Sequence, residues 1–167
     1  MAKIIHTMIR VLDLDKSIKF YEQAFALTPS HQLDFEDFAL VYLRNKENDM
    51  EIELTLNKGE TEPYSHGNGY GHVAMCVDNI DSEHQRFNEL GLNPTDIVTF
   101  APDDNLSIPY FCIKIQVRNH ANISNDTETI NTETIRNILT STLAHHALRL
   151  PHIAICIGPI QFYNTLQ

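Results

Sequence analysis

Apolar and polar residues alternate in short runs along the first part of the chain, with one segment where the period becomes helical. Residues 3–11 are rich in Ile and Val, which is typical of a β-strand. In residues 17–25, SIKFYEQAF, the apolar positions recur at helical spacing, and Asp15 before them is a predicted N-cap. Three short strands are predicted after this helix, at residues 31–35, 38–43 and 50–56. The order of elements is therefore βαβββ.

The same pattern begins again after a linker that contains Gly, Glu and Pro. A shift of 66 residues places His6 on His72, and the motif HxxxxVxxLD recurs as HxxxxVxxID. Gly91 is expected just after the second helix, because glycine is favoured at this position. A period of 66 residues is too long for a solenoid. We therefore predict an α+β fold made of paired βαβββ modules, residues 1–58 and 70–117.

The composition changes after residue 117. Residues 119–134 are rich in Ser, Thr and Asn and predict a loop, whereas residues 134–150 have the spacing of an amphipathic helix. Residues 151–163 are apolar and predict an added strand. We interpret residues 118–167 as an atypical C-terminal extension of the domain formed by residues 1–117.

The charge and the cysteines restrict the possible functions. The 167 residues carry a net charge of -10, which disfavours contact with the phosphate backbone of a nucleic acid. No apolar run approaches the ~18 residues that span a bilayer, so no membrane partner is expected. The start of the chain lacks the unbroken apolar core of a signal peptide. The cysteines, Cys76, Cys112 and Cys156, are odd in number without CxxC spacing and predict buried free thiols, which favours a cytoplasmic location.

Two imidazoles and one carboxylate stand out on separate predicted strands. His6 opens the first strand, Glu53 lies in an alternating apolar strand, and His72 begins the second module. Each alone is compatible with an ordinary polar residue, but together, at related positions of a repeat, they predict a metal site. The repeat also demands a counterpart of Glu53 near residue 119, where the sequence has no acid.

The segments HTMIRV, SIKFYEQAF, ELTLNKG and YGHVAMCVD together resemble glyoxalase I (lactoylglutathione lyase) of the short bacterial type, over residues 3–106. The family belongs to the vicinal-oxygen-chelate fold, which is built from paired βαβββ modules. By resemblance, His6, Glu53 and His72 are three of four metal ligands. Arg10 and Asn57 match positions that hold the glutathione part of the substrate, and His72 is expected beside that substrate as well.

The resemblance also implies an activity, a metal and an assembly. The hemithioacetal of methylglyoxal and glutathione would be isomerised to S-lactoylglutathione, a step of methylglyoxal detoxification. The metal would be Ni²⁺ or Co²⁺ in preference to Zn²⁺, and the protein would be a homodimer whose sites combine ligands of two subunits. The family's fourth ligand, a Glu after an Asp-Pro-Asp-Gly turn (DPDGYKIE), also moves the proton. That turn is absent here, and Gln116 is the nearest match to the Glu.

Two other functions stay open on the sequence. Two histidines and one carboxylate are also the ligand set of Fe(II)-dependent oxygenases, and the same fold includes ring-cleaving dioxygenases. Alternatively, the chain is a non-catalytic small-molecule-binding protein that has kept the cleft and lost the base. Arg10 and Asn57 favour the glutathione conjugate as substrate over a catechol.

Overall fold

The structure is a computed structural model that describes residues 2–65, 72–103, 106–114 and 154–158. The chain forms two compact units, and the described residues up to Ser65 belong to the first unit and all later ones to the second. The predicted helix at residues 134–150 and the candidate position Gln116 lie outside the described residues.

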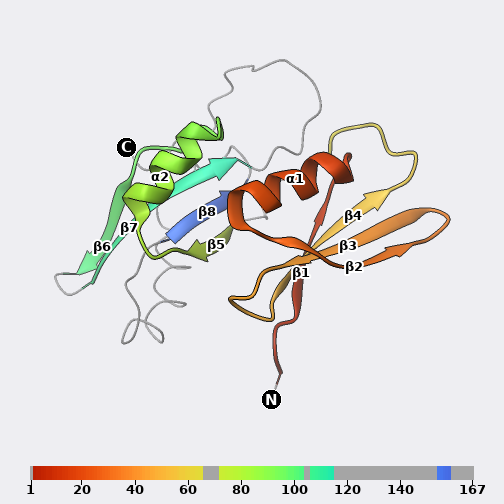
Figure 1. Ribbon diagram of the computed structural model, residues 1–167, viewed down its shortest axis with the longest axis horizontal. Coiled ribbons are helices and arrows are strands. Elements are labelled where there is room, and N and C mark those ends of the chain that lie inside the picture. The colour runs from red at the N-terminus through yellow and green to blue at the C-terminus, as the bar shows by residue number, and fades with distance from the viewer. Residues whose placement is uncertain (1, 66–71, 104–105, 115–153, 159–167) are drawn as a thin grey trace. The chain divides into compact units, whose positions relative to one another are not determined.

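The described residues of the first unit form one helix on a four-stranded sheet (Figure 1). Its elements are β1 (His6–Arg10), α1 (Leu14–Phe25), β2 (Thr28–Asp34), β3 (Phe38–Arg44) and β4 (Glu51–Asn57). The strand order is β1-β4-β3-β2, with β1 parallel to β4 and the other pairs antiparallel. The βαβββ prediction is therefore confirmed for this unit, although β2 begins earlier than expected.

Local sequence explains where α1 begins and ends. The N-cap is Asp13, whose carboxylate accepts a hydrogen bond from the Lys16 backbone N–H at 3.0 Å, so the prediction of Asp15 as the cap was wrong. Asp15 instead lies in the first turn, where its negative charge favours the positive end of the helix dipole. The helix ends at Phe25, and the C-cap residue Ala26 adopts the left-handed conformation with φ of 52°.

The sheet of the first unit has two chemically different faces because side chains alternate along each strand. One face packs against α1 and is apolar; its buried members are Ile9, Ala39, Val41, Leu43, Ile52 and Leu54. The residues between them point to the opposite face, which we call the polar face. It carries His6, Met8, Arg10, Phe38, Leu40, Tyr42, Glu51, Glu53, Thr55 and Asn57.

The described residues of the second unit also form one helix and a four-stranded sheet. Its elements are β5 (Val73–Cys76), α2 (Ile80–Glu89), β6 (Val98–Asp103), β7 (Leu106–Lys114) and β8 (Ala154–Gly158). The strand order is β5-β8-β7-β6, which matches the order of the first unit element by element. As predicted, Gly91 follows α2, with a positive φ of 71°. A core of apolar and aromatic residues, Ile80, Phe87, Ile108, Phe111 and Ile113, lies in this unit.

One strand breaks the equivalence of the two sheets. In the first unit, β4 follows β3 through a short turn, and it runs antiparallel to β3 and parallel to β1. In the second, β8 comes from residues predicted as part of the extension; it runs parallel to β7 and antiparallel to β5. The added strand predicted within residues 151–163 is thus confirmed, and its direction is opposite to that of β4. The domain boundary at residue 117 stays a prediction.

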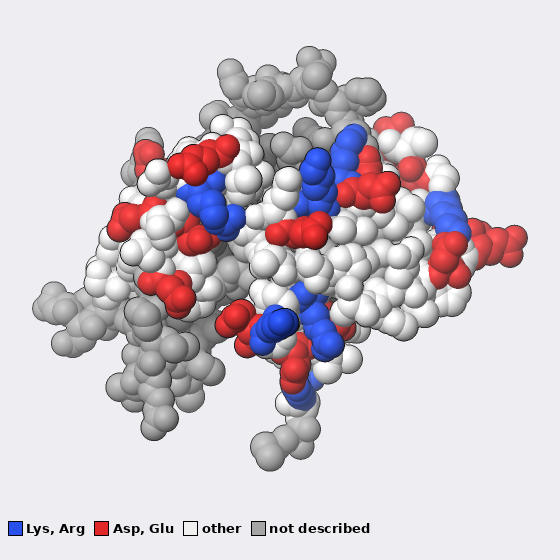
Figure 2. Space-filling view, viewed as in Figure 1, with Lys and Arg blue, Asp and Glu red and all other residues white. Residues whose placement is uncertain are grey.

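Charged side chains of both signs lie on the surface, and the two described cysteines differ in exposure. Figure 2 shows basic side chains beside acidic ones, and the close ion pairs include Lys3–Asp49 and Lys58–Asp34, each at 2.6 Å. Cys112 is a buried free thiol as predicted, whereas Cys76 is exposed because it lies at the end of the edge strand β5. No helix in the described ranges is long and apolar enough to cross a membrane.

Candidate metal centre

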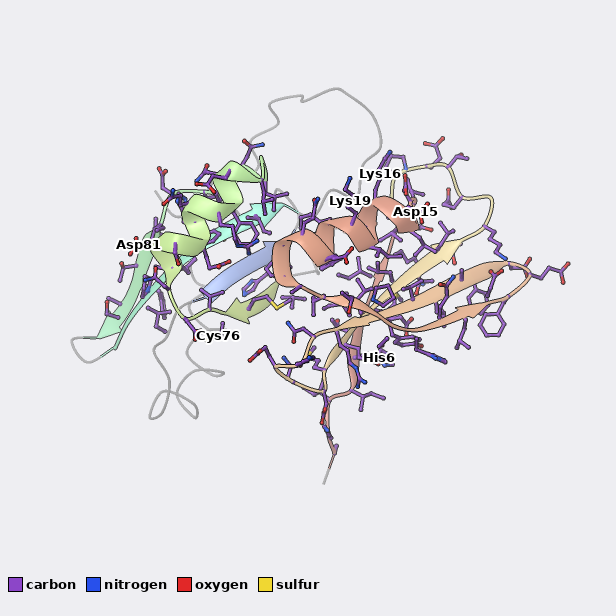
Figure 3. The ribbon with its side chains drawn as sticks, viewed as in Figure 1. His6, Asp15, Lys16, Lys19, Cys76 and Asp81 are labelled. Atoms are coloured by element: carbon purple, nitrogen blue, oxygen red, sulfur yellow. The ribbon has the colours of Figure 1, made fainter. Side chains whose placement is uncertain are left out.

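The centre of the polar face is an imidazole beside a carboxylate. His6 comes from β1 (Figure 3) and Glu53 from the neighbouring strand β4, where Glu53 is paired with Met8 in the strand register. The His6 Nε2 atom lies 3.3 Å from Glu53 Oε2. The His6 side chain is 36% exposed and that of Glu53 only 11%, so the imidazole borders solvent and the carboxylate is nearly enclosed.

The separation of these two atoms fits a shared metal ion. Nitrogen and oxygen ligands bind ions such as Zn²⁺ at about 2.0–2.2 Å. Two such bonds at an angle between 90° and 110° place the ligand atoms roughly 3.0–3.5 Å apart. The 3.3 Å between His6 Nε2 and Glu53 Oε2 is an ion-pair contact that also falls in this range, so the separation is compatible with two ligands of one ion.

Two hydroxyl groups hold the Glu53 carboxylate. Thr55 Oγ1 donates a hydrogen bond to Glu53 Oε1 at 3.1 Å, and the Tyr42 hydroxyl also hydrogen-bonds to this carboxylate. The bond to Glu53, together with partial burial and the charges of Glu53 and Glu51, raises the pKa of Tyr42 above its ordinary value of 10.0. The phenol is therefore a neutral donor at physiological pH. Neither hydroxyl was identified from the sequence, although both lie at alternating positions of predicted strands.

The residues proposed to bind glutathione lie on the same face. Arg10 is exposed and is paired with Thr55 in the strand register, and Asn57 ends β4 two residues later. The Asn57 amide donates a hydrogen bond to the Tyr64 hydroxyl at 3.1 Å. The first unit thus brings His6, Glu53, Arg10 and Asn57 to one face of one sheet. Tyr64, which lies in the predicted linker, was missed.

His72 belongs to the second unit, where it directly precedes β5 and is half-buried. Its role as a ligand stays a prediction. Among the residues that the structure describes, no three His, Cys, Asp or Glu side chains are grouped closely enough to hold a metal ion. Of the three predicted ligands, His6 and Glu53 are the two that the described part of the chain brings together, and their role as ligands stays a prediction.

The position equivalent to Glu53 in the second unit carries no acid. Glu53 lies opposite Met8 across β1 and β4. The 66-residue shift relates Met8 to Ala74, and the residue opposite Ala74 in β8 is Cys156. The whole of β8 reads AICIG, without a carboxylate.

Comparison with known proteins places the chain in a family. The family model described as Glyoxalase/Bleomycin resistance protein/Dioxygenase superfamily matches residues 3–108. The chain belongs to this superfamily. This glyoxalase-superfamily chain is 40% identical over 98 residues to a lactoylglutathione lyase of Haemophilus influenzae, covering 56% of this chain and 71% of the relative. It is 39% identical over 93 residues to a probable lactoylglutathione lyase of Synechocystis, covering 53% and 70% of the two chains.

Solved structures support the same fold. The glyoxalase I of Leishmania major aligns with 89% of this glyoxalase-superfamily chain and 100% of its own, with a TM-score of 0.51 at 22% identity. The predicted α+β fold of paired modules is confirmed by this similarity and by the family match. The family match ends at residue 108, before the segment that supplies β8.

Proposed function

We propose that the chain is a metal-dependent enzyme of the lactoylglutathione lyase type, which isomerises the hemithioacetal of methylglyoxal and glutathione to S-lactoylglutathione. The names of the relatives at 39–40% identity support this reaction. The observation that carries the proposal is the His6–Glu53 pair, whose 3.3 Å separation fits two ligands of one metal ion. The same face offers Arg10 and Asn57 for the glutathione part.

The metal ion would be held by His6 and Glu53 from the first unit of one chain and by His72, which belongs to the second unit, from another chain. A divalent ion there supplies Lewis acidity that stabilises negative charge developing on the substrate oxygens. We infer Ni²⁺ or Co²⁺ in preference to Zn²⁺ from the resemblance to the short bacterial group.

The chain's own residues would bind and orient the substrate. Glutathione carries carboxylates, and a guanidinium binds a carboxylate through two parallel hydrogen bonds, which suits the exposed Arg10. Asn57 offers both a donor and an acceptor to the peptide groups of glutathione, and its bond to Tyr64 fixes the side chain. These contacts would hold the reacting carbons next to His6 and Glu53.

The proton transfer is where this chain departs from its relatives. The family's acid at the fourth ligand position has no counterpart in β8, and a neutral amide such as Gln116 accepts no proton at pH 7. General-base catalysis contributes about 10²–10⁴-fold, so we infer lyase activity weaker than that of a relative by at least this factor. This observation also favours the second candidate function, a protein that binds the glutathione conjugate without turning it over.

Metal-free protein tests the proposal directly. Ni²⁺, Co²⁺ and Zn²⁺ are added separately, and the formation of S-lactoylglutathione is followed by its absorbance. We expect slow turnover with Ni²⁺ or Co²⁺ and less with Zn²⁺. A glutathione conjugate that binds in the presence of metal without turnover would favour the binding protein, and aerobic cleavage of a catechol with Fe²⁺ would favour a dioxygenase.

We further propose a homodimer in which His6 and Glu53 of one subunit share a metal with His72 of the other. A heterodimer of a His6→Ala chain and a His72→Ala chain tests this sharing. If the ligands of a site come from two subunits, one of the two sites combines His6 and Glu53 of the His72→Ala chain with His72 of the His6→Ala chain. That site keeps all three ligands and should bind metal. A monomer in light scattering at micromolar concentration contradicts the proposal. The cytoplasmic location stays a prediction.

A further inference from the structure

The two carboxylate oxygens of Glu53 have different neighbours. Thr55 Oγ1 donates to Oε1 at 3.1 Å, while Oε2 is the atom that lies 3.3 Å from His6 Nε2. Thr55 follows Glu53 by two residues in β4, so both side chains emerge on the polar face as neighbours. The bond to Oε1 restrains rotation of the carboxylate and leaves Oε2 directed at the imidazole.

Tyr42 contacts both members of the pair. It lies opposite Glu53 in the register of β3 and β4, and its hydroxyl hydrogen-bonds to the Glu53 carboxylate. Its ring also packs edge-on against the His6 ring, with 5.6 Å between the ring centres and an angle of 74° between the planes. One side chain therefore restrains the carboxylate by a hydrogen bond and the imidazole by a ring contact.

From these contacts we propose that Tyr42 and Thr55 are the positioning residues of the metal centre. They hold Glu53 Oε2 and His6 Nε2 at the separation that a metal ion needs, before the ion binds. This inference rests on the proposed function, because it assumes that His6 and Glu53 are ligands. Groups that hydrogen-bond to metal ligands typically change metal affinity 10–100-fold when they are removed.

Conservative substitutions separate positioning from mere packing. Tyr42→Phe removes the hydroxyl and keeps the ring against His6, and Thr55→Val removes the donor at nearly constant volume. Thr55→Ser keeps the donor. Tyr21→Phe is the matched control for loss of a phenol hydroxyl, because Tyr21 lies on α1, which packs against the opposite face of the sheet.

The test is the affinity of the full chain for Ni²⁺, measured by calorimetry, with the visible absorption of bound Co²⁺ as a second readout. We expect Tyr42→Phe and Thr55→Val each to bind Ni²⁺ about 10–100-fold more weakly. Both should also alter the Co²⁺ spectrum. Thr55→Ser and Tyr21→Phe should bind like the unmodified chain, and thermal unfolding checks that every variant is folded.

Glu53→Gln separates failure of this inference from failure of the proposed function. If Glu53→Gln loses the metal while Tyr42→Phe and Thr55→Val bind it as tightly as the unmodified chain, the positioning role is wrong and the ligand assignment stands. If Glu53→Gln binds Ni²⁺ with unchanged affinity, the metal centre itself is wrong, and the positioning role fails with it.

Discussion

Replacing the C-terminal residues by an ending of the family type should supply the proton-transfer group that we propose this chain lacks. In the first unit, the short turn between β3 and β4 makes β4 antiparallel to β3 and parallel to β1, and this direction brings Glu53 opposite Met8. Residues 115–167 would be replaced by a segment that begins DPDGYKIE, directly after the end of β7 at Lys114. The tight turn should create a strand antiparallel to β7 and parallel to β5, with the new Glu on it.

The size of the effect follows from the role of the new carboxylate. A positioned general base accelerates proton transfer about 10²–10⁴-fold, which corresponds to a barrier lower by about 2.7–5.4 kcal/mol. A second anionic ligand would also raise the affinity of the site for the divalent cation. We therefore expect a gain in turnover of at least about 100-fold over the unmodified chain. In that chain β8 runs in the reverse direction and offers Cys156 at the corresponding register position.

The assay is the rate of S-lactoylglutathione formation at saturating Ni²⁺. The matched control is the same new ending with Gln in place of its Glu, because that variant has the same strand without the base. The Glu ending should be active and the Gln ending should resemble the unmodified chain. Equal rates for the two endings would refute the reasoning, as would full activity of the unmodified chain, since another residue would then supply the base.

Three further predictions concern the first unit. Ni²⁺ at 100 times its Kd should stabilise the unmodified chain against urea by about 2.7 kcal/mol; Glu53→Gln should lose this gain, and an equal gain in both would exclude Glu53 as a ligand. Arg10→Ala should weaken the binding of S-methylglutathione about 10–100-fold in calorimetry, since a charged hydrogen bond contributes about 1.5–3 kcal/mol; unchanged affinity would contradict its role. The raised pKa of Tyr42, caused first by its hydrogen bond to Glu53, gives stability that is fully present below pH 10.0 and is lost as the pH rises through the folded-state pKa. Unfolding free energy should therefore fall less above pH 10.0 in Tyr42→Phe than in the unmodified chain, and parallel pH curves would contradict the prediction.

Local chemistry made much of the first unit predictable. The alternation of apolar residues fixes which side of each strand faces the helix, so His6 and Glu53 could be placed on strands from the sequence. The N-cap shows the limit of such reasoning. Asp13 and Asp15 both lie near the start of α1, and the extended backbone of Asp13 and its hydrogen bond from the Lys16 N–H identify Asp13 as the cap.

The neighbours of the site could not be predicted from spacing alone. Tyr42 meets Glu53 because β3 pairs with β4 in one particular register, and a shift by one residue would have turned Tyr42 to the opposite face. Register depends on the packing of the whole sheet, which a local pattern does not contain. The contact of Tyr42 with His6 depends in addition on β1 lying beside β4.

The sequence by itself determined the repeat, the candidate ligands and the absence of the DPDGYKIE ending, because these depend only on residue types and their spacing. Only the tertiary structure decided which strand completes the second sheet. β8 begins 40 residues after the end of β7 and runs parallel to it. An edge strand has unpaired backbone groups, so it can pair with a segment from far along the chain. Parallel and antiparallel pairing both satisfy backbone N–H and C=O groups, although with different hydrogen-bond patterns, so β8 completes the sheet without supplying a carboxylate.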